Sequence, residues 1–129
     1  MAKSNFENLR VYILSETLAD LVWEIVSERK NFPKDAIGKQ LVRATDSIGA
    51  NIAEGSGRGS DPDNRRFLKI ARGSLYETQH WLRRAYKRSL LTQKQVDNLL
   101  PIINELTPKL NAYLRSVGNM KKKPLPLSN

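Results

Sequence analysis

The chain has 129 residues and a formal net charge of +9, with 22 Lys and Arg against 13 Asp and Glu. This length predicts one domain, and the 40% hydrophobic and 27% charged residues are typical of a globular protein. No apolar run approaches the roughly 20 residues of a membrane span, no signal-peptide core is recognisable, and the absence of cysteine excludes disulfides and thiolate metal sites. We therefore expect a cytoplasmic protein without a membrane partner, whose excess positive charge suits a polyanion such as nucleic acid.

The first predicted helix runs from about residue 5 to residue 30. Its apolar residues alternate at spacings of three and four, which places them on one buried face. This seam consists of Val11, Leu14, Leu18, Leu21 and Ile25, widened by Val22 and Val26. Another side of the helix has an acidic residue at every fourth position, beside Trp23: Glu16, Asp20, Glu24 and Glu28. This acidic stripe is either a solvated face or a surface that docks against a basic face of a second subunit.

A second helix is expected from Pro33, which suits a first helical turn because its missing N–H costs nothing there, to Glu54. Its buried stripe is Ile37, Leu41, Ala44, Ile48 and Ile52. Beside the stripe lie the polar residues Ser47, Asn51 and Glu54, which can reach a neighbouring helix or the backbone. We interpret Asn51 and Glu54 as partly buried packing residues, with ligand binding as the alternative. Gly55 is expected to supply the left-handed residue that ends the helix.

Residues 55–60 form a glycine-rich turn that could be mistaken for a phosphate-binding loop. The turn lacks the Gly-x-x-x-x-Gly-Lys-Ser/Thr spacing, and it follows a helix, whereas nucleotide-binding loops follow a strand. We interpret it as an interhelical loop, in which Arg58 either contacts a backbone phosphate or pairs with Glu54.

The third predicted helix begins with Asp61 as N-cap and Pro62 as first residue, and it continues to about Ser89. Its core seam is Leu68, Ala71, Leu75, Thr78, Leu82 and Ala85, flanked by Phe67, Ile70 and Trp81. A second stripe combines cations and tyrosines: Arg65, Lys69, Arg72, Tyr76, Gln79, Arg83 and Tyr86, bordered by Arg66, Arg84, Lys87 and Arg88. Between residues 58 and 90 there are nine Lys and Arg against three Asp and Glu, so this third of the chain carries most of the excess charge.

This basic stripe predicts a nucleic-acid surface. Guanidinium groups bind phosphate oxygens in pairs, and tyrosines stack on unpaired bases. The alternative is a solubilising helix face whose long side chains lie over the core. We favour nucleic acid, and RNA over DNA, with these candidate contacts: Arg58, Arg65, Arg66, Lys69, Arg72, Tyr76, Arg83, Arg84, Tyr86, Lys87 and Arg88.

A capping box predicts the start of the fourth helix: Thr92 is the N-cap, and Gln95 follows three residues later. Its seam is Val96, Leu99, Ile103, Leu106, Leu110, Tyr113 and Val117. Pro101 and Pro108 are one heptad apart on the outward side and should bend the helix without ending it. Four such seams with short connections predict an all-α, antiparallel, up-down-up-down four-helix bundle over residues 1–118, followed by a basic, disordered tail over 119–129.

Glu77 and His80 form the only pattern that resembles a metal or catalytic motif. A Glu-x-x-His pair occurs in di-iron bundles, but those sites need a second such pair, and this chain has a single histidine. Without cysteine or further histidines, neither a zinc cage nor a Cys–His nucleophile can be assembled. We expect no enzyme, no metal and no cofactor.

The central run Ser-Ile-x-x-Asn-Ile-Ala-Glu-Gly-x-Gly-Arg resembles the 23S rRNA intervening-sequence protein family, also called four helix bundle proteins. The matching residues are Phe32-Pro33, Gln40, Arg43-Ala44, Ser47-Ile48, Asn51 to Gly55, Gly57-Arg58, Phe67-Leu68, Ile70-Ala71 and Gly73-Ser74. A more distant resemblance is to the accessory variability determinant proteins of diversity-generating retroelements, which partner a reverse transcriptase. The resemblance implies a homopentameric barrel and no established enzymatic role.

Together these observations predict a non-catalytic, oligomeric, nucleic-acid-binding protein, with an adaptor that partners a reverse transcriptase, or another interaction scaffold, as the alternative. The acidic stripe of one subunit and the basic stripe of another make two different complementary faces, which close into a ring. The interface residues would include Glu16, Asp20, Trp23 and Glu24. Cations used in that interface are lost to nucleic acid, and then Arg58, the cations from Arg83 to Arg88, and the lysine tail must carry the binding.

Overall fold

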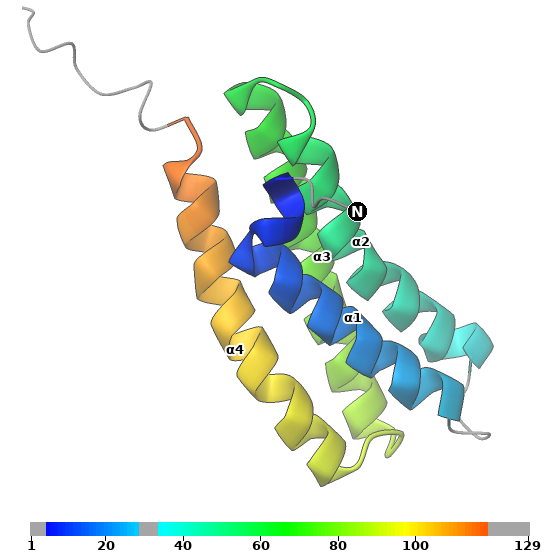
Figure 1. Cartoon of the computed structure of the whole chain (residues 1–129). Coiled ribbons are helices and arrows are strands. Elements are labelled where there is room, and N and C mark those ends of the chain that lie inside the picture. The colour runs from blue at the N-terminus through cyan, green and yellow to red at the C-terminus, as the bar shows by residue number, and fades with distance from the viewer. Residues whose placement is uncertain (1–4, 29–33, 119–129) are drawn as a thin grey trace, which may run out of the picture.

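The structure, a computed structural model, is an all-α, antiparallel four-helix bundle and describes residues 5–28 and 34–118 (Figure 1). Its elements in chain order are a 3₁₀ turn η1 (Asn5–Asn8), α1 (Arg10–Glu28), a π turn η2 (Lys34–Gly38), α2 (Lys39–Ser56), α3 (Asp61–Lys87) and α4 (Gln93–Ser116). Each helix packs on the next one in the chain, and α1 also packs on α4, so the four helices enclose a single core. The predicted fold class is confirmed.

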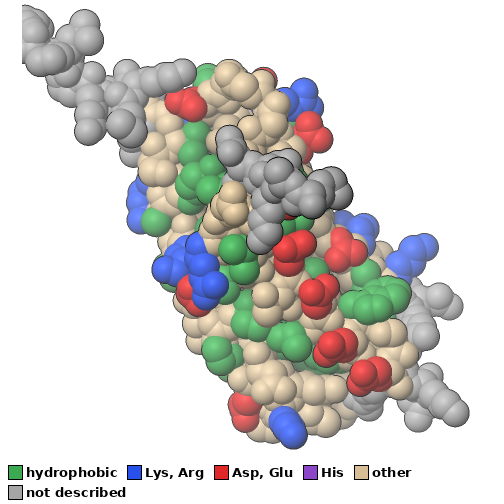
Figure 2. Space-filling model, in the orientation of Figure 1, with side chains coloured by type: hydrophobic (Ala, Val, Ile, Leu, Met, Phe, Trp, Pro, Cys, Tyr) green, Lys and Arg blue, Asp and Glu red, His purple; other side chains and the backbone are tan. Residues whose placement is uncertain are grey.

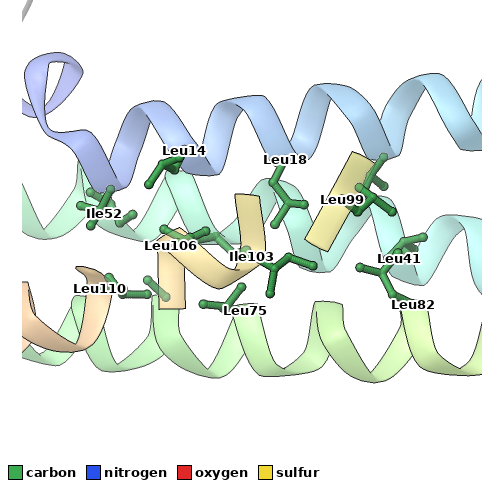
Figure 3. Packing of buried hydrophobic residues seen from close by; sticks show 14 of the residues in the cluster. Leu14, Leu18, Leu41, Ile52, Leu75, Leu82, Leu99, Ile103, Leu106 and Leu110 are labelled. Carbon is green, nitrogen blue, oxygen red and sulfur yellow. The ribbon is translucent and has the colours of Figure 1, made fainter. Parts of the chain in front are cut away.

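The core is formed by the four seams that the sequence predicts, whose side chains point between the helices (Figure 3). Leu18, Leu41, Leu75 and Leu106 have no exposed surface at all. Leu21 is the one member of the α1 seam that is only partly buried, and in the fourth seam Val96 and Tyr113 are also partly buried. Every residue of the predicted stripe of the second helix and of the predicted core seam of the third is buried, whereas Ile70, which was predicted to flank the latter, is 43% exposed.

The ends of the first and third helices differ from the predictions. Residues 5–8 form a separate 3₁₀ turn, in which the ring of Phe6 packs edge-on against Tyr12 at 5.0 Å, and the α-helix begins only at Arg10. The N-cap of α3 is Ser60 rather than Asp61, because the Ser60 hydroxyl accepts a hydrogen bond from the Asp63 N–H at 3.4 Å. Asp61 is instead inside the first turn, where a negative charge favours the helix dipole.

Gly55 has a different role from the one predicted. It is buried within α2, which continues to Ser56, and it is not in the left-handed region. A Cβ atom there would lie 2.9 Å from Phe67 Cβ and 2.6 Å from Asn64 Oδ1, so the glycine lets α2 and α3 approach closely. The left-handed residue of the turn is Gly59, with φ of 82°.

The fourth helix confirms its predicted start. Thr92 Oγ1 accepts from the Gln95 N–H at 3.1 Å, and Gln95 Oε1 accepts from the Thr92 N–H at 2.9 Å. Pro101 and Pro108 are both exposed, and the helix continues through them. Pro33, the predicted end of the first helix at residue 30 and the tail from 119 to 129 lie outside the described residues. Among the described helices, none combines the length and the hydropathy that crossing a membrane requires.

Candidate nucleic-acid interface

The polar residues of the central motif join α2 to α3. The half-buried Asn51 donates to the carbonyl of Ser47 at 2.8 Å and to its hydroxyl at 3.1 Å, and the Ser74 hydroxyl donates to Ser47 Oγ at 3.1 Å. Asn51 is therefore partly buried and hydrogen-bonded within α2. Glu54 is exposed instead of partly buried and pairs with Arg58 at 3.1 Å, because its position faces the α2–α3 turn rather than the helix contact.

The basic stripe of α3 is divided between side chains that contact α4 and side chains that have no partner. One side of α3 faces α4, where Arg65 donates to the carbonyl oxygens of Leu114 and Val117. On the same side Arg72 donates to Asn111 Oδ1 at 3.3 Å, and Gln79 donates to Thr107 Oγ1 at 3.4 Å. Arg65 thus satisfies carbonyl groups that a helix C-terminus leaves without partners. These side chains hold α3 and α4 together.

Five other cations of α3 have no side-chain partner, and one of them, Arg83, lies on the side that faces α4. Lys69, Arg83, Lys87 and Arg88 are exposed and Arg84 is partly exposed, and none of the five has an ion pair or hydrogen bond within the described residues. Four of them lie within the six residues from 83 to 88, at the end of the helix. Two tyrosines, Tyr76 and Tyr86, are each 48% exposed on the same helix.

Five other cations of the described chain are paired with carboxylates, whereas Lys39, Lys94 and Arg115 are exposed without an ion pair there. Arg10 donates to both oxygens of Glu105 at 2.8 and 2.9 Å, and Arg43 pairs with Glu77. The remaining pairs are Lys109 with Glu105, Arg58 with Glu54, and Arg66 with Asp63. Arg58 and Arg66 also lie over the Phe67 ring, with their guanidinium carbons 4.8 and 4.4 Å from its centre. The densest group of unpaired cations among the described residues therefore lies at the C-terminal end of α3.

A groove opens between α3 and α4 beside these cations. It has a volume of about 300 Å³, and we call it the α3–α4 groove. Its wall is apolar, whereas its rim carries polar groups. The residues that line it are Gln79, Leu82, Arg83, Tyr86, Leu91, Val96, Leu99, Leu100, Ile103 and Asn104. Sequence reasoning did not predict this groove, since it depends on how far apart the two helices lie at this end of the bundle.

The acidic stripe lies on the opposite part of the bundle, over α1, where Figure 2 shows a run of acidic side chains. Glu16, Asp20, Glu24 and Glu28 are all exposed, and Trp23 beside them is 60% exposed. None of the four carboxylates forms an ion pair among the described residues.

A hollow of about 330 Å³ between α1 and α2 adds a further carboxylate to this face, Asp46. Partial burial raises the pKa of Asp46, and the charge of Asp20 raises it further. Burial, and then the charge of Glu16, raise the pKa of Tyr12 in the same hollow. Gly49 and Ser15 also line the hollow, and a Cβ atom added at Gly49 would lie 2.9 Å from Ser15 Oγ.

The Glu77–His80 pair has ordinary partners. Glu77 accepts from Arg43 and from the Trp81 indole N–H at 3.1 Å, and the exposed His80 ring packs edge-on against Trp81 at 4.9 Å. Among the described residues, no three His, Asp or Glu side chains gather as a metal site would require.

A helical bundle with polar packing between α2 and α3, and with charges segregated on its outside, belongs to the class of small four-helix-bundle proteins. The sequence model of the 23S rRNA-intervening sequence protein family matches residues 7–112. The chain therefore belongs to this family. A search of curated proteins found no match.

Among solved structures, the bundle is similar to the crystal structure of a protein of unknown function from the S23 ribosomal protein family of Bacteroides thetaiotaomicron. The two share 28% sequence identity with a TM-score of 0.70, over 82% of this chain and 99% of the other. Neither comparison points to an enzymatic activity.

Proposed function

We propose that the protein is a non-catalytic RNA-binding protein that contacts the phosphate backbone with the C-terminal end of α3. The observation that carries this proposal is the segregation of paired and unpaired cations. Arg10, Arg43, Arg58 and Arg66 are matched by Glu or Asp, and Arg65 and Arg72 donate to oxygen atoms of α4. Arg83, Arg84, Lys87 and Arg88 have no side-chain partner within the described residues and form the densest group of such cations. Unpaired cations keep their full charge for a ligand, and a cluster of them within two helical turns concentrates the field.

The contacts expected from the sequence do not all suit this surface. Arg65 and Arg72 are engaged with α4, and Arg58 and Arg66 are engaged with carboxylates and Phe67. We therefore propose that the RNA surface consists of Arg83, Arg84, Tyr86, Lys87 and Arg88. The family's name links it to ribosomal RNA genes, which favours RNA as the nucleic acid.

The test is binding of a structured RNA at several salt concentrations. Each phosphate contact contributes about 0.7 to 0.9 to the slope of log affinity against log salt. Replacing Arg83, Lys87 and Arg88 with glutamine should therefore lower the slope by about 2 to 3 and weaken binding at low salt. The matched control replaces three cations that have carboxylate partners, Arg10, Arg43 and Lys109, with glutamine.

The two triple variants lose the same net charge. If both weaken binding equally, the contact is a general attraction to a basic protein and the proposed surface is wrong. If the wild-type protein binds no RNA near physiological salt, the proposed function itself is wrong, and a protein adaptor becomes the better hypothesis.

We further propose that copies of the chain associate through the acidic stripe of α1. Trp23 is the most exposed large apolar side chain of the described residues, and aromatic residues are enriched at interface centres. The complementary surface on a second copy would be the middle of α3, where Lys69, Ile70 and Tyr76 are exposed. Two different faces make a head-to-tail contact that closes into a ring, and the family resemblance suggests five subunits.

This arrangement leaves Arg83 to Arg88 free for RNA and gathers several copies of that surface on one assembly, so that weak contacts reinforce one another. Light scattering near physiological salt tests it, because the monomer has a mass of 14.7 kDa. Asp20→Lys combined with Glu24→Lys should dissociate the assembly. A monomeric wild-type protein, or an assembly that survives this charge reversal, would refute the contact.

A further inference from the structure

The α3–α4 groove has an apolar wall, and some of the apolar and aromatic side chains at its opening are exposed to solvent. Leu99 and Ile103 are 2% and 6% exposed and form part of the wall, whereas Leu100 at the opening is 44% exposed. Tyr86 lines the groove with 48% of its surface exposed, and its hydroxyl donates to Gln93 Oε1 at 3.2 Å, which orients the ring. The groove therefore offers an open, apolar place next to a fixed aromatic ring.

The rim of the groove offers hydrogen-bonding groups. Gln79 uses its amide N–H₂ to donate to Thr107, so its carbonyl oxygen has no partner within the described residues. The Asn104 side chain is exposed and has no hydrogen bond within the same part of the chain. A side-chain amide presents a donor and an acceptor together, which matches the paired donors and acceptors on the edge of a nucleobase.

The charge around the groove selects an anionic occupant. Between residues 79 and 104 there are five Lys and Arg against one Asp, and Arg83 itself lines the groove. The volume of about 300 Å³ is at the lower end of the range of small-molecule sites, roughly 300 to 1,000 Å³. This size suits a single planar group rather than a helix of another protein.

We propose that the groove receives one unpaired nucleobase of the bound RNA. The base stacks on Tyr86 and packs against Leu100, its edge meets Gln79 and Asn104, and its phosphate lies by Arg83. A fully paired duplex cannot supply this occupant because its bases are stacked inside the helix. This inference rests on the proposed RNA-binding function and makes it specific for RNA with bulges, loops or single-stranded ends.

The experiment compares two RNA hairpins that have the same number of phosphates. One carries a single bulged adenosine, and the other carries an abasic ribose at the same position. Base–aromatic stacking is sequence-tolerant and strong enough to be measured this way. The full-length wild-type protein should bind the bulged hairpin about ten-fold more tightly than the abasic one, and a bulged DNA hairpin shows whether the site requires ribose.

Three variants test whether the preference for the bulged hairpin comes from the α3–α4 groove. Tyr86→Ala and Leu100→Gln should both remove this preference, whereas Tyr86→Phe keeps the ring and should keep the preference. Tyr76→Ala is the positional control, since Tyr76 is equally exposed on the same helix but does not line the groove. Circular dichroism and light scattering confirm that each variant keeps the helicity and mass of the wild type.

The outcomes separate the two proposals. Equal binding of both hairpins by the wild type, or a preference that survives in Tyr86→Ala and Leu100→Gln, would overturn the base site while leaving RNA binding in place. Absence of binding to either hairpin would overturn both.

Discussion

Two glycines of the family motif should respond in opposite ways to the same substitution. At Gly55 an added methyl group would meet Asn64 Oδ1 at 2.6 Å, Phe67 Cβ at 2.9 Å and the Asn64 carbonyl oxygen at 3.1 Å. The Asn64 carbonyl oxygen is part of the backbone of α3, and Phe67 Cβ is bonded directly to it. A side-chain rotation therefore cannot relieve these two contacts, and the two helices must separate. Overpacking of this kind costs about 1 to 3 kcal/mol, and the better helix propensity of alanine returns about 1 kcal/mol. Gly55→Ala should therefore lower the free energy of unfolding by up to about 2 kcal/mol.

Gly73 lies within α3 on the outward side, and an added Cβ there would find no other atom within 4 Å. Only the propensity term remains, and glycine in a helix is about 1 kcal/mol less favourable than alanine. Gly73→Ala should raise the free energy of unfolding by about this amount, which corresponds to an increase in Tm of roughly 3 to 5 °C for a chain of this size.

Urea unfolding followed by circular dichroism, with the two variants and the wild type at one protein concentration, measures both effects. A Gly55→Ala protein stabilised as much as Gly73→Ala would show that the α2–α3 contact has slack and would refute the packing argument. A destabilised Gly73→Ala protein would show that the outward side of α3 is covered in the folded state, in conflict with the open surface described above.

Three further changes test other parts of the structure by thermal or urea unfolding. Arg65→Met removes the donor that satisfies two carbonyl oxygens of α4 and should destabilise the protein by about 1 to 3 kcal/mol, whereas the neighbouring, exposed Arg66→Met should cost less than about 1 kcal/mol. Thr92→Ala removes the capping box and should cost about 1 kcal/mol; an unchanged midpoint would show that the cap adds nothing to the tertiary packing. Folding raises the pKa of Asp46, so its carboxyl group ionises more easily in the unfolded state. The folded state therefore loses stability as the pH rises through the folded-state pKa. Asp46→Asn should therefore raise the urea midpoint at neutral pH, and the difference should vanish near pH ~3, where the carboxyl group is protonated in both states.

The sequence predicted the core because a bundle seam is a local, periodic property. Leu68, Leu75 and Leu82 repeat at heptad spacing, and any neighbour that covers one of them covers all three. The capping box of Thr92 and Gln95 was predictable for a similar reason, since both partners lie within one helical turn.

The sequence could not assign the basic stripe as well, because partners distant in the chain decide the role of each cation. Arg65 is separated by 49 residues from Leu114, to which it donates, and nothing local distinguishes it from the unpaired Arg83.

Gly55 shows a different limit. Glycine at the end of a helical pattern is compatible both with a left-handed cap and with close contact between helices. The choice depends on the position of Phe67 on α3, which is a property of the tertiary structure.

The segregation of charge also gives the molecule a permanent electric dipole. The unpaired carboxylates lie on α1 and the unpaired cations at the end of α3, and these two helices are diagonal to each other because each packs on α2 and α4. In the field of a polyanion such a particle experiences a torque as well as an attraction, so it turns its α3 end forward before contact. Orientation of this kind raises the rate of productive encounters at low ionic strength. The effect fades as the screening length shortens to about 8 Å at physiological salt, so that pre-orientation then acts only in the last stage of approach.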